Sequence, residues 1–335
     1  MKAAVFYGPR DLKVVDTEKP EAGPEGVLVR VKAAGVCGTD LHTYKTGIFK
    51  EMSLSIEGGA VFGHEFAGDV VEVGSEADVQ DIKVGDRVAA IDFGAYAEYA
   101  RVGPEVLGAP VVFKIPDHVS YEEAATIEPL SVSAHTVRRA QPLETDIVLI
   151  LGAGMIGMGC IQVLKAKYSV KQIIVADISD KRLALAKELG ADLVIDVKEE
   201  DIVKKMLELT GSASVLFNTK PTAHVDVVLE CAGLELTAQQ ALEVVKPVTG
   251  RAVVVALYED APIKIDLNDA VTKTNDILGV FGAQEEDIRT AIELIITGKV
   301  DRKPLITHQF PLDEAKEAFE TQLRTNDSLK VMINP

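Results

Sequence analysis

Four side chains in the first part of the sequence are of the types that make a catalytic zinc site. Cys37 offers a thiolate, His64 an imidazole, and Glu65 and Glu128 each offer a carboxylate. One ligand of each type can hold zinc with the fourth position open to water or substrate, where the ion acts as a Lewis acid. Spacing alone does not establish this site, because a single cysteine or histidine is more often a packed core residue.

A glycine-rich segment in the middle of the chain has the pattern of a dinucleotide-binding loop. Gly152, Gly154 and Gly157 follow the continuous apolar run Ile147–Leu151 and open a helical pattern. The first glycine permits a tight turn, the second lets backbone amides approach a pyrophosphate, and the third allows close packing of helix and strand. Because the pattern falls between a strand and a helix, it predicts a dinucleotide site.

The acidic residue after this loop indicates which dinucleotide is used. Asp177 ends the next apolar run, where a carboxylate accepts hydrogen bonds from both hydroxyls of the adenosine ribose. A 2′-phosphate would be repelled there, so the sequence favours NAD over NADP. Lys181 and Arg182 lie close by and keep NADP as the alternative.

The segment that carries these residues alternates between strand and helix patterns. Helical patterns cover 155–168 and 180–189, and the apolar runs that predict buried strands are 147–151, 173–176, 193–195, 225–229, 252–257 and 277–281. Such alternation is typical of a doubly wound parallel sheet, so the predicted fold class is α/β.

The candidate zinc ligands lie on a segment of a different kind. Short β-branched runs at 27–31, 70–73 and 84–90 predict a compact antiparallel β unit, with residues 37–42 in a turn. Residues 304–335 lack the strand–helix alternation and are expected to pack back on this unit. We therefore expect two domains, one formed by 1–132 and 300–335 and the other by 133–299.

Composition excludes several classes of function. The net charge of −17 argues against a nucleic-acid surface. Three cysteines, an odd number, make no disulfide framework and favour a reducing compartment. The N-terminus becomes polar too early for a signal peptide, and no apolar run reaches the ~18 residues of a membrane span. We expect a cytoplasmic protein that binds neither nucleic acid nor membrane.

Several motifs together resemble the zinc-dependent medium-chain alcohol dehydrogenase family. The string GHEFAGDVVEVG (63–74) resembles its zinc signature, and CGTDLH (37–42) resembles the segment with its first zinc ligand. EPLSVSAHTV, LGAGMIG, VDVVLECAG and GKVDRKPLITHQFPLDEAKEAF fit the same family in the same order, over essentially the whole chain. The resemblance leans toward the polyol (sorbitol) and L-threonine dehydrogenase branch, which has glutamate at the third-ligand position.

The resemblance implies a fold and a set of ligands. The fold would be a GroES-like β domain, completed by the C-terminal segment, with a Rossmann domain. Cys37 and His64 would be zinc ligands, and Glu65 and Glu128 compete for the third place. Asp40 would orient a ligand from behind, as metal sites generally require.

The resemblance also assigns the proton path and the cofactor contacts. Thr39 resembles a hydroxyl relay that draws the alcohol proton away, His42 resembles the next station toward solvent, and Glu128 is grouped with them as catalytic. Hydride then passes from the carbinol carbon to the nicotinamide. Further residues match family positions that contact the cofactor: Ile156, Arg182 and, more weakly, Val280 and Phe281.

The chain departs from the family in three places. Many relatives carry a four-cysteine lobe for a second, structural zinc, but here Asp92 and Phe93 lead directly into the segment GAYAEYARV. We therefore expect one catalytic and no structural zinc, and a homo-oligomer whose usual tetramer contacts are in doubt. An Arg-Tyr pair of sorbitol-type enzymes is replaced by Phe281-Gly282-Ala283, and an aromatic stretch of L-threonine dehydrogenases is not matched by residues 43–50.

Three functions follow in order of preference. The first is zinc- and NAD-dependent oxidation of a small secondary alcohol, a polyol or diol, to a ketone. The second is oxidation of an amino alcohol resembling L-threonine. The third is a zinc-free, NAD-binding structural or regulatory protein, which the retained ligand set disfavours. Residues 212–224, longer than expected before VDVVLECAG, are interpreted as a surface loop.

Overall fold

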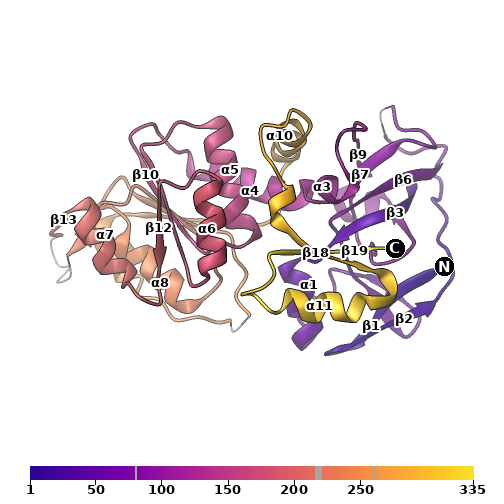
Figure 1. The fold of residues 1–335 in the computed structure, drawn as a ribbon, viewed down its shortest axis with the longest axis horizontal. Coiled ribbons are helices and arrows are strands. Elements are labelled where there is room, and N and C mark those ends of the chain that lie inside the picture. Colours follow the sequence, from indigo (N-terminus) through magenta and orange to yellow (C-terminus); the bar gives the residue numbers. More distant parts are fainter. Residues whose placement is uncertain (80, 216–220, 260) are drawn as a thin grey trace. The chain divides into compact units, whose positions relative to one another are not determined.

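The chain forms two compact units in a computed structural model, which describes residues 1–79, 81–215, 221–259 and 261–335 (Figure 1). The first unit consists of Met1–Glu128 and Ile292–Pro335, and the second of Pro129–Ala291. Helices α4 (Ile127–Ala140) and α10 (Glu285–Ile296) each contain one of the two boundaries. Within the described residues, no helix is both long enough and apolar enough to cross a bilayer.

A seven-stranded sheet forms the centre of the first unit. Its order is β18-β19-β3-β6-β7-β9, and β8 also pairs with β3. Most neighbours are antiparallel, as the short β-branched runs predict. The strands are β3 (Val27–Gly35), β6 (Phe66–Val73), β7 (Arg87–Ile91), β8 (Tyr99–Val102), β9 (Val111–Lys114), β18 (Ile306–Pro311) and β19 (Lys330–Asn334).

The C-terminal strand lies beside a strand from the start of the chain. Met332 of β19 pairs with Gly35 of β3 in an antiparallel register, and Figure 1 shows the yellow end of the chain among the indigo strands. Strands β18 and β19 run parallel with helix α11 (Ala315–Gln322) between them. The expectation that residues 304–335 lack strand–helix alternation is therefore wrong. The helix was overlooked because its buried positions include polar Thr321 and Gln322 and are interrupted by charged residues.

A smaller sheet and short helices complete the first unit. The sheet has the order β2-β1-β5-β4, and the core includes the buried aromatic residues Phe62, Phe66, Tyr96 and Phe319. Its strands are β1 (Lys2–Gly8), β2 (Asp11–Asp16), β4 (Leu54–Ile56) and β5 (Gly59–Val61). The helical segments are α1 (Gly38–Thr46), α2 (Pro104–Leu107), α3 (Tyr121–Ala125), and the 3-10 turns η1 (Lys303–Leu305) and η2 (Leu312–Glu314).

The second unit is a doubly wound parallel sheet, as predicted. The order β12-β11-β10-β15-β16-β17 places the first strand in the middle, and every neighbouring pair is parallel. The strands are β10 (Ile147–Leu151), β11 (Gln172–Asp177), β12 (Leu193–Asp196), β15 (Val227–Glu230), β16 (Arg251–Val254) and β17 (Asp276–Gly279). The helices within it are α5 (Met155–Lys167), α6 (Asp180–Glu188), α7 (Ile202–Thr210), α8 (Glu235–Val244) and α9 (Asn268–Lys273).

The central strands are buried because their side chains are apolar on both faces. All five residues of β10 and all four of β15 are buried, which is what a continuous apolar run predicts. The predicted surface loop at 212–224 includes a short antiparallel pair, β13 (Ser212–Ala213) with β14 (Thr222–Ala223). Residues 216–220 of that prediction lie outside the described residues.

Candidate metal centre and dinucleotide site

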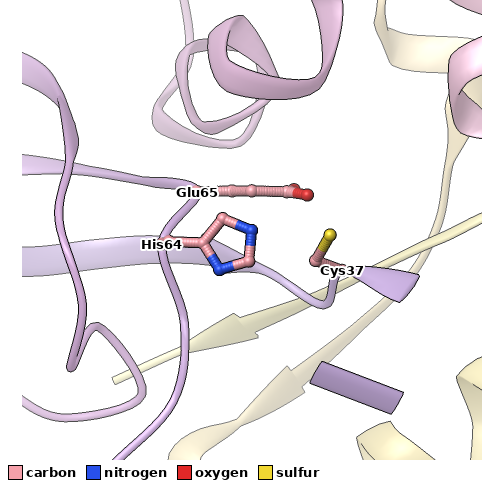
Figure 2. A group of neighbouring side chains, drawn as sticks. All are labelled: Cys37, His64 and Glu65. Atoms are coloured by element: carbon pink, nitrogen blue, oxygen red, sulfur yellow. The ribbon is translucent and has the colours of Figure 1, made fainter. Parts of the chain in front are cut away.

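Three of the predicted ligands come together in the first unit. One ligand atom from each of Cys37, His64 and Glu65 lies within 4.8 Å of the others, and Figure 2 shows the three side chains converging. Cys37 comes just before α1, and His64 and Glu65 come just before β6. Because β6 pairs with β3, which leads into Cys37, the sheet brings the two segments together.

The start of α1 positions the thiol. Residues 37–42, predicted as a turn, are instead the beginning of a helix with Cys37 at its N-cap. The helix begins here for a local reason. The Cys37 N–H donates to Asp40 Oδ2 at 3.2 Å, and this bond caps the helix. Burial raises the pKa of the Cys37 thiol, the charge of His64 lowers it and that of Glu65 raises it.

The imidazole of His64 is buried and incompletely satisfied. Its exposed fraction is 7%, and its Nδ1 atom has no hydrogen-bond partner within the described part of the chain. Asp40 Oδ1 lies 3.7 Å from Nδ1. Burial lowers the pKa of His64, but Cys37 and Asp40 outweigh it and hold that pKa well above its usual range. With Nδ1 on the side of Asp40, the other ring nitrogen points toward Cys37 and Glu65 (Figure 2), where it can bind a metal.

Asp40 connects the two candidate ligands from behind. It is 2% exposed, and its Oδ2 atom accepts both the Cys37 N–H and, at 2.6 Å, the Tyr96 hydroxyl. Burial raises the pKa of Asp40. The charge of His64 and the hydrogen bond from Tyr96 offset part of this rise. The carboxylate therefore holds the Cys37 backbone and faces His64, an arrangement that can orient both candidate ligands. Tyr96 was not predicted because it lies 56 residues away in sequence and no local pattern points to it.

Glu65 is held by a buried ion pair. Its carboxylate is 1% exposed, and Lys330 Nζ of β19 donates to Oε2 at 2.6 Å and to the Val36 carbonyl at 3.0 Å. A side chain at position 35 would collide with this carboxylate, since a Cβ built on Gly35 would lie 2.4 Å from Oε2. Lys330 was also missed, because it lies 265 residues away in sequence.

Glu128 lies outside the group of three but responds to its charges. It belongs to the first turn of α4 and is half-buried. Removal from water raises the pKa of Glu128 to about 7, His64 opposes this shift and Glu65 adds to it. Glu128 is therefore electrostatically coupled to His64 and Glu65 without completing their cluster.

The two predicted relay residues follow Cys37 on α1. Thr39 Oγ1 lies 3.8 Å from Cys37 Sγ, and its side chain is partly exposed. His42 lies one helical turn after Thr39, and its ring meets that of Phe49 edge-on with centroids 6.3 Å apart. A hydroxyl beside the candidate metal ligand and a partly exposed imidazole one turn away can pass a proton in sequence.

The glycine loop of the second unit makes a tight turn between β10 and α5. Gly152 has φ +98°, a conformation that favours glycine, and a Cβ there would press against Ala232 at 3.0–3.1 Å. A Cβ on Gly157 would lie 2.0 Å from the Gly152 carbonyl oxygen, so the helix can approach the strand only without a side chain. Gly154 is the N-cap of α5, and a Cβ there would meet no described atom within 4 Å. The space beside Gly154 is therefore open at the N-terminus of α5, the end of a helix that binds phosphate.

Asp177 holds this loop at the end of β11. Its two carboxylate oxygens accept the Ala153 N–H at 2.7 Å and the Ser179 N–H at 2.8 Å. The side chain is half-buried. Arg182, in the first turn of α6, lies near enough for Asp177 to raise its pKa, although burial lowers the pKa of Arg182 overall.

The remaining predicted contacts are distributed along the same edge of the sheet. Ile156 is partly exposed in the first turn of α5. Val280 is buried after β17, where its N–H donates to the Val254 carbonyl at 2.9 Å, whereas Phe281 is 68% exposed. These residues follow the carboxyl ends of parallel strands, which is where ligands of doubly wound sheets bind.

Together, a thiolate–imidazole–carboxylate cluster on a β unit and a glycine loop on a doubly wound sheet define a class, the metal-dependent dinucleotide dehydrogenases. Comparisons with known proteins agree. Residues 23–117 match the alcohol dehydrogenase GroES-like domain, and residues 156–297 match the zinc-binding dehydrogenase domain. The first match confirms the predicted GroES-like β domain.

Relatives with an assigned activity extend over nearly the whole chain. Sorbitol dehydrogenase of Arabidopsis thaliana is 34% identical, covering 99% of this chain and 94% of the relative. Sorbitol dehydrogenase of Bos taurus is 36% identical, covering 98% and 94%. The crystal structure of 2R,3R-butanediol dehydrogenase from Bacillus subtilis has a TM-score of 0.82 at 28% identity, covering 100% and 99%. The chain belongs to the zinc-dependent medium-chain polyol dehydrogenase family.

Membership settles the broad activity. The protein is an oxidoreductase of the alcohol dehydrogenase type, with zinc and a nicotinamide dinucleotide as its cofactors and a small alcohol as its substrate. The predicted family, fold class and enzyme class are thus confirmed.

Proposed function

We propose that this enzyme oxidises a secondary alcohol group of a polyol or diol to a ketone, using one zinc ion and NAD. The observation that carries the proposal is the cluster of Cys37, His64 and Glu65, whose ligand atoms all lie within 4.8 Å of one another. The printed activities of the similar sorbitol and butanediol dehydrogenases support this substrate class.

Cys37 and His64 would hold the zinc, with Glu65 as the third ligand. Glu65 is preferred to Glu128 because its carboxylate lies within the group of three. Bound zinc supplies Lewis-acid polarisation of the substrate oxygen. Asp40 orients Cys37 and His64 during this step, and Lys330 holds one oxygen of Glu65 in place.

Thr39 and His42 would carry the proton of the alcohol away. Thr39 Oγ1 accepts the hydroxyl proton of the substrate while its own proton moves on, and the ring of His42 delivers it to solvent. Both side chains are partly exposed, which supports their access to substrate and water. Glu128 would be a further carboxyl group that interacts electrostatically with His64 and Glu65. The nicotinamide accepts the hydride.

The cofactor would be NAD and the zinc count one per chain. Asp177 places a carboxylate at the end of β11, where it would accept the ribose hydroxyls and repel a 2′-phosphate. A four-cysteine structural site is incompatible with a sequence that contains only three cysteines, of which Cys37 is already used.

The protein would be a homo-oligomer that associates through the second unit. Strand β17 is at the edge of the six-stranded sheet, where its free side can pair with another strand. Ile277 on this strand is 41% exposed, and the nearby Val271 and Phe281 are 73% and 68% exposed. An exposed edge with apolar side chains is what a pairing surface requires.

The deciding experiment measures metal content per chain, together with NAD reduction before and after chelation. We expect about one zinc per chain, with activity on sugar alcohols or butanediols lost on chelation and restored by zinc. Cys37→Ser should lose the metal, while Cys231→Ser, a control in the second unit, should keep it. Absence of metal in the parent would contradict the proposal. Faster turnover of L-threonine than of any polyol would mean that the substrate is an amino alcohol and not a polyol or diol.

A further inference from the structure

Glu230 is a buried carboxylate at the end of β15 that none of the predicted roles uses. Its exposed fraction is 0%. Three donors converge on Oε1, the N–H groups of Ala232 and Gly233 at 2.9 Å each and the Thr237 hydroxyl at 2.8 Å. Oε2 accepts the Tyr258 hydroxyl at 2.8 Å. A carboxylate removed from water is costly unless its oxygens are satisfied, so four donors mark a fixed arrangement.

These donors come from two different loops. Ala232 and Gly233 belong to the turn after β15, and Thr237 lies in the first turn of α8, near the positive end of the helix dipole. Tyr258 belongs to the segment after β16, the next strand of the sheet. One side chain therefore holds together the loops that follow two neighbouring strands.

The same turn contacts the dinucleotide loop. Glu230 pairs in register with Leu151, the residue before Gly152. A Cβ on Gly152 would lie 3.0 Å from the Ala232 nitrogen, so Ala232 packs directly against the first glycine of the loop. Gly233 lies close to the segment after β16, because a Cβ built on Gly233 would lie 2.8 Å from the Leu257 carbonyl oxygen. Displacement of the 231–233 turn would therefore change the wall beside Gly152.

From this arrangement we infer that Glu230 is a positioning residue for the nicotinamide dinucleotide. It holds the 231–233 turn against Gly152 and ties that turn to Tyr258, so that the edge of the sheet is already shaped for the cofactor. The inference rests on the proposed dinucleotide site. It adds that affinity for the cofactor depends on a residue that does not contact it.

The test compares NADH affinity and zinc content among variants of the full-length, zinc-loaded enzyme. Glu230→Ala removes the acceptor for all four donors and should raise the Kd for NADH at least about tenfold, which is the effect of one such network. KM for NAD should rise with it, while kcat changes less and zinc content stays the same. Glu230→Gln keeps one oxygen for the three donors and should stay within about threefold of the parent.

Asp226 provides a control at the opposite end of the same strand. Its Oδ2 accepts the Ile147 N–H at 2.9 Å and its Oδ1 accepts Lys246 Nζ at 2.9 Å, just before β15 begins. Asp226→Asn should lower the melting temperature as the Glu230 variants do but leave the Kd for NADH unchanged. If Asp226→Asn weakened NADH binding as much as Glu230→Ala, Glu230 would contribute only to the stability of the unit, and the inference would be overturned.

Tyr258→Phe keeps the test decisive if Glu230→Ala does not fold. It removes a single donor and should raise the Kd for NADH about twofold to threefold. Unchanged affinity in Glu230→Ala, or in Tyr258→Phe if only that variant folds, would overturn the inference while the parent still binds NADH. Failure of the parent itself to bind NADH would overturn the proposed function, and the inference with it.

Discussion

At the scale of single residues, the chemistry depends on carboxylates that are held by hydrogen bonds. Asp177 shows this in the second unit, where both oxygens already accept backbone N–H groups from Ala153 and Ser179. The bonds fix the carboxylate at the loop before any cofactor binds. Its remaining lone pairs are the ones that can accept ribose hydroxyls.

Asp177→Asn is expected to reduce the preference for NAD. An amide cannot accept both N–H groups, and it no longer repels a 2′-phosphate, so kcat/KM for NAD should fall about tenfold or more while that for NADP rises. Measuring both values at equal zinc loading gives the ratio. Asp180→Asn is the matched control, because Asp180 is exposed, lies three residues further on and pairs with Lys198. If Asp180→Asn moved the ratio as much as Asp177→Asn, only net charge would matter.

The sequence predicted the candidate ligands by type but not the residues that hold them. Cys37, His64 and Glu65 were found from their chemistry and from motif resemblance, and both signals are local. Tyr96 and Lys330 reach the same site through contacts 56 and 265 residues away in sequence. Such contacts follow from the sheet topology of the whole unit, which no short pattern specifies.

At the scale of elements, an ion pair joins helices α4 and α10 through two residues of the second unit. Asp287, near the start of α10, has a side chain only 2% exposed and accepts from Arg138 of α4 through two bonds, of 2.7 and 2.9 Å. The Gln284 N–H also donates to it, at 3.0 Å. Burial alone would raise the pKa of Asp287, but these bonds outweigh it and lower the pKa below its usual value.

Asp287→Asn is expected to lower the unfolding free energy by roughly 2 kcal/mol at neutral pH, because charge-assisted bonds to a buried group are lost. A carboxylate whose pKa is depressed in the folded state stabilises above its unfolded pKa of about 4 and loses this effect as pH falls. The difference in unfolding free energy between the parent and the variant should therefore be largest at pH 7 and should shrink below pH 4. Denaturant unfolding at several pH values measures it.

Glu286→Gln is the control for that pair. Glu286 also contacts Arg138, at 2.7 Å, but it is 61% exposed. Exposed ion pairs contribute about 0–1 kcal/mol, so this variant should resemble the parent at every pH. A constant difference between Asp287→Asn and the parent down to pH 3 would mean that packing, not the charge of Asp287, holds the two helices.

Elements were predicted where apolar residues occupy the buried positions and were missed where polar residues share those positions. Strand β10 was predicted with its observed ends, since five consecutive buried apolar residues have no other simple explanation. Helix α1 was predicted as a turn because its buried positions are Asp40, Thr43 and Tyr44, so no apolar stripe marks it. Helix α11 was missed for a related reason, its buried positions being mixed with charged residues. Tertiary contacts stabilise these helices, and local propensity does not reveal such contacts.

At the scale of the whole molecule, the sheet of the second unit ends in an exposed strand that natural proteins usually protect. Edge strands carry unpaired N–H and C=O groups and are normally short, charged or covered. Strand β17 is short, yet Ile277 on it is 41% exposed and Phe281 just after it is 68% exposed. A second copy of the chain pairing along this edge would satisfy the backbone groups and bury both side chains.

Ile277→Lys is therefore expected to convert a dimer into a monomer, because two lysines would meet where two apolar side chains had packed. Light scattering coupled to size exclusion should give the parent twice the chain mass and Ile277→Lys once that mass at micromolar concentration. Leu143→Lys is the matched control, since Leu143 is 61% exposed on the same unit and lies outside β17. It should remain dimeric. A monomeric parent would refute the oligomer, and a dimer that survives Ile277→Lys would place the interface on another surface.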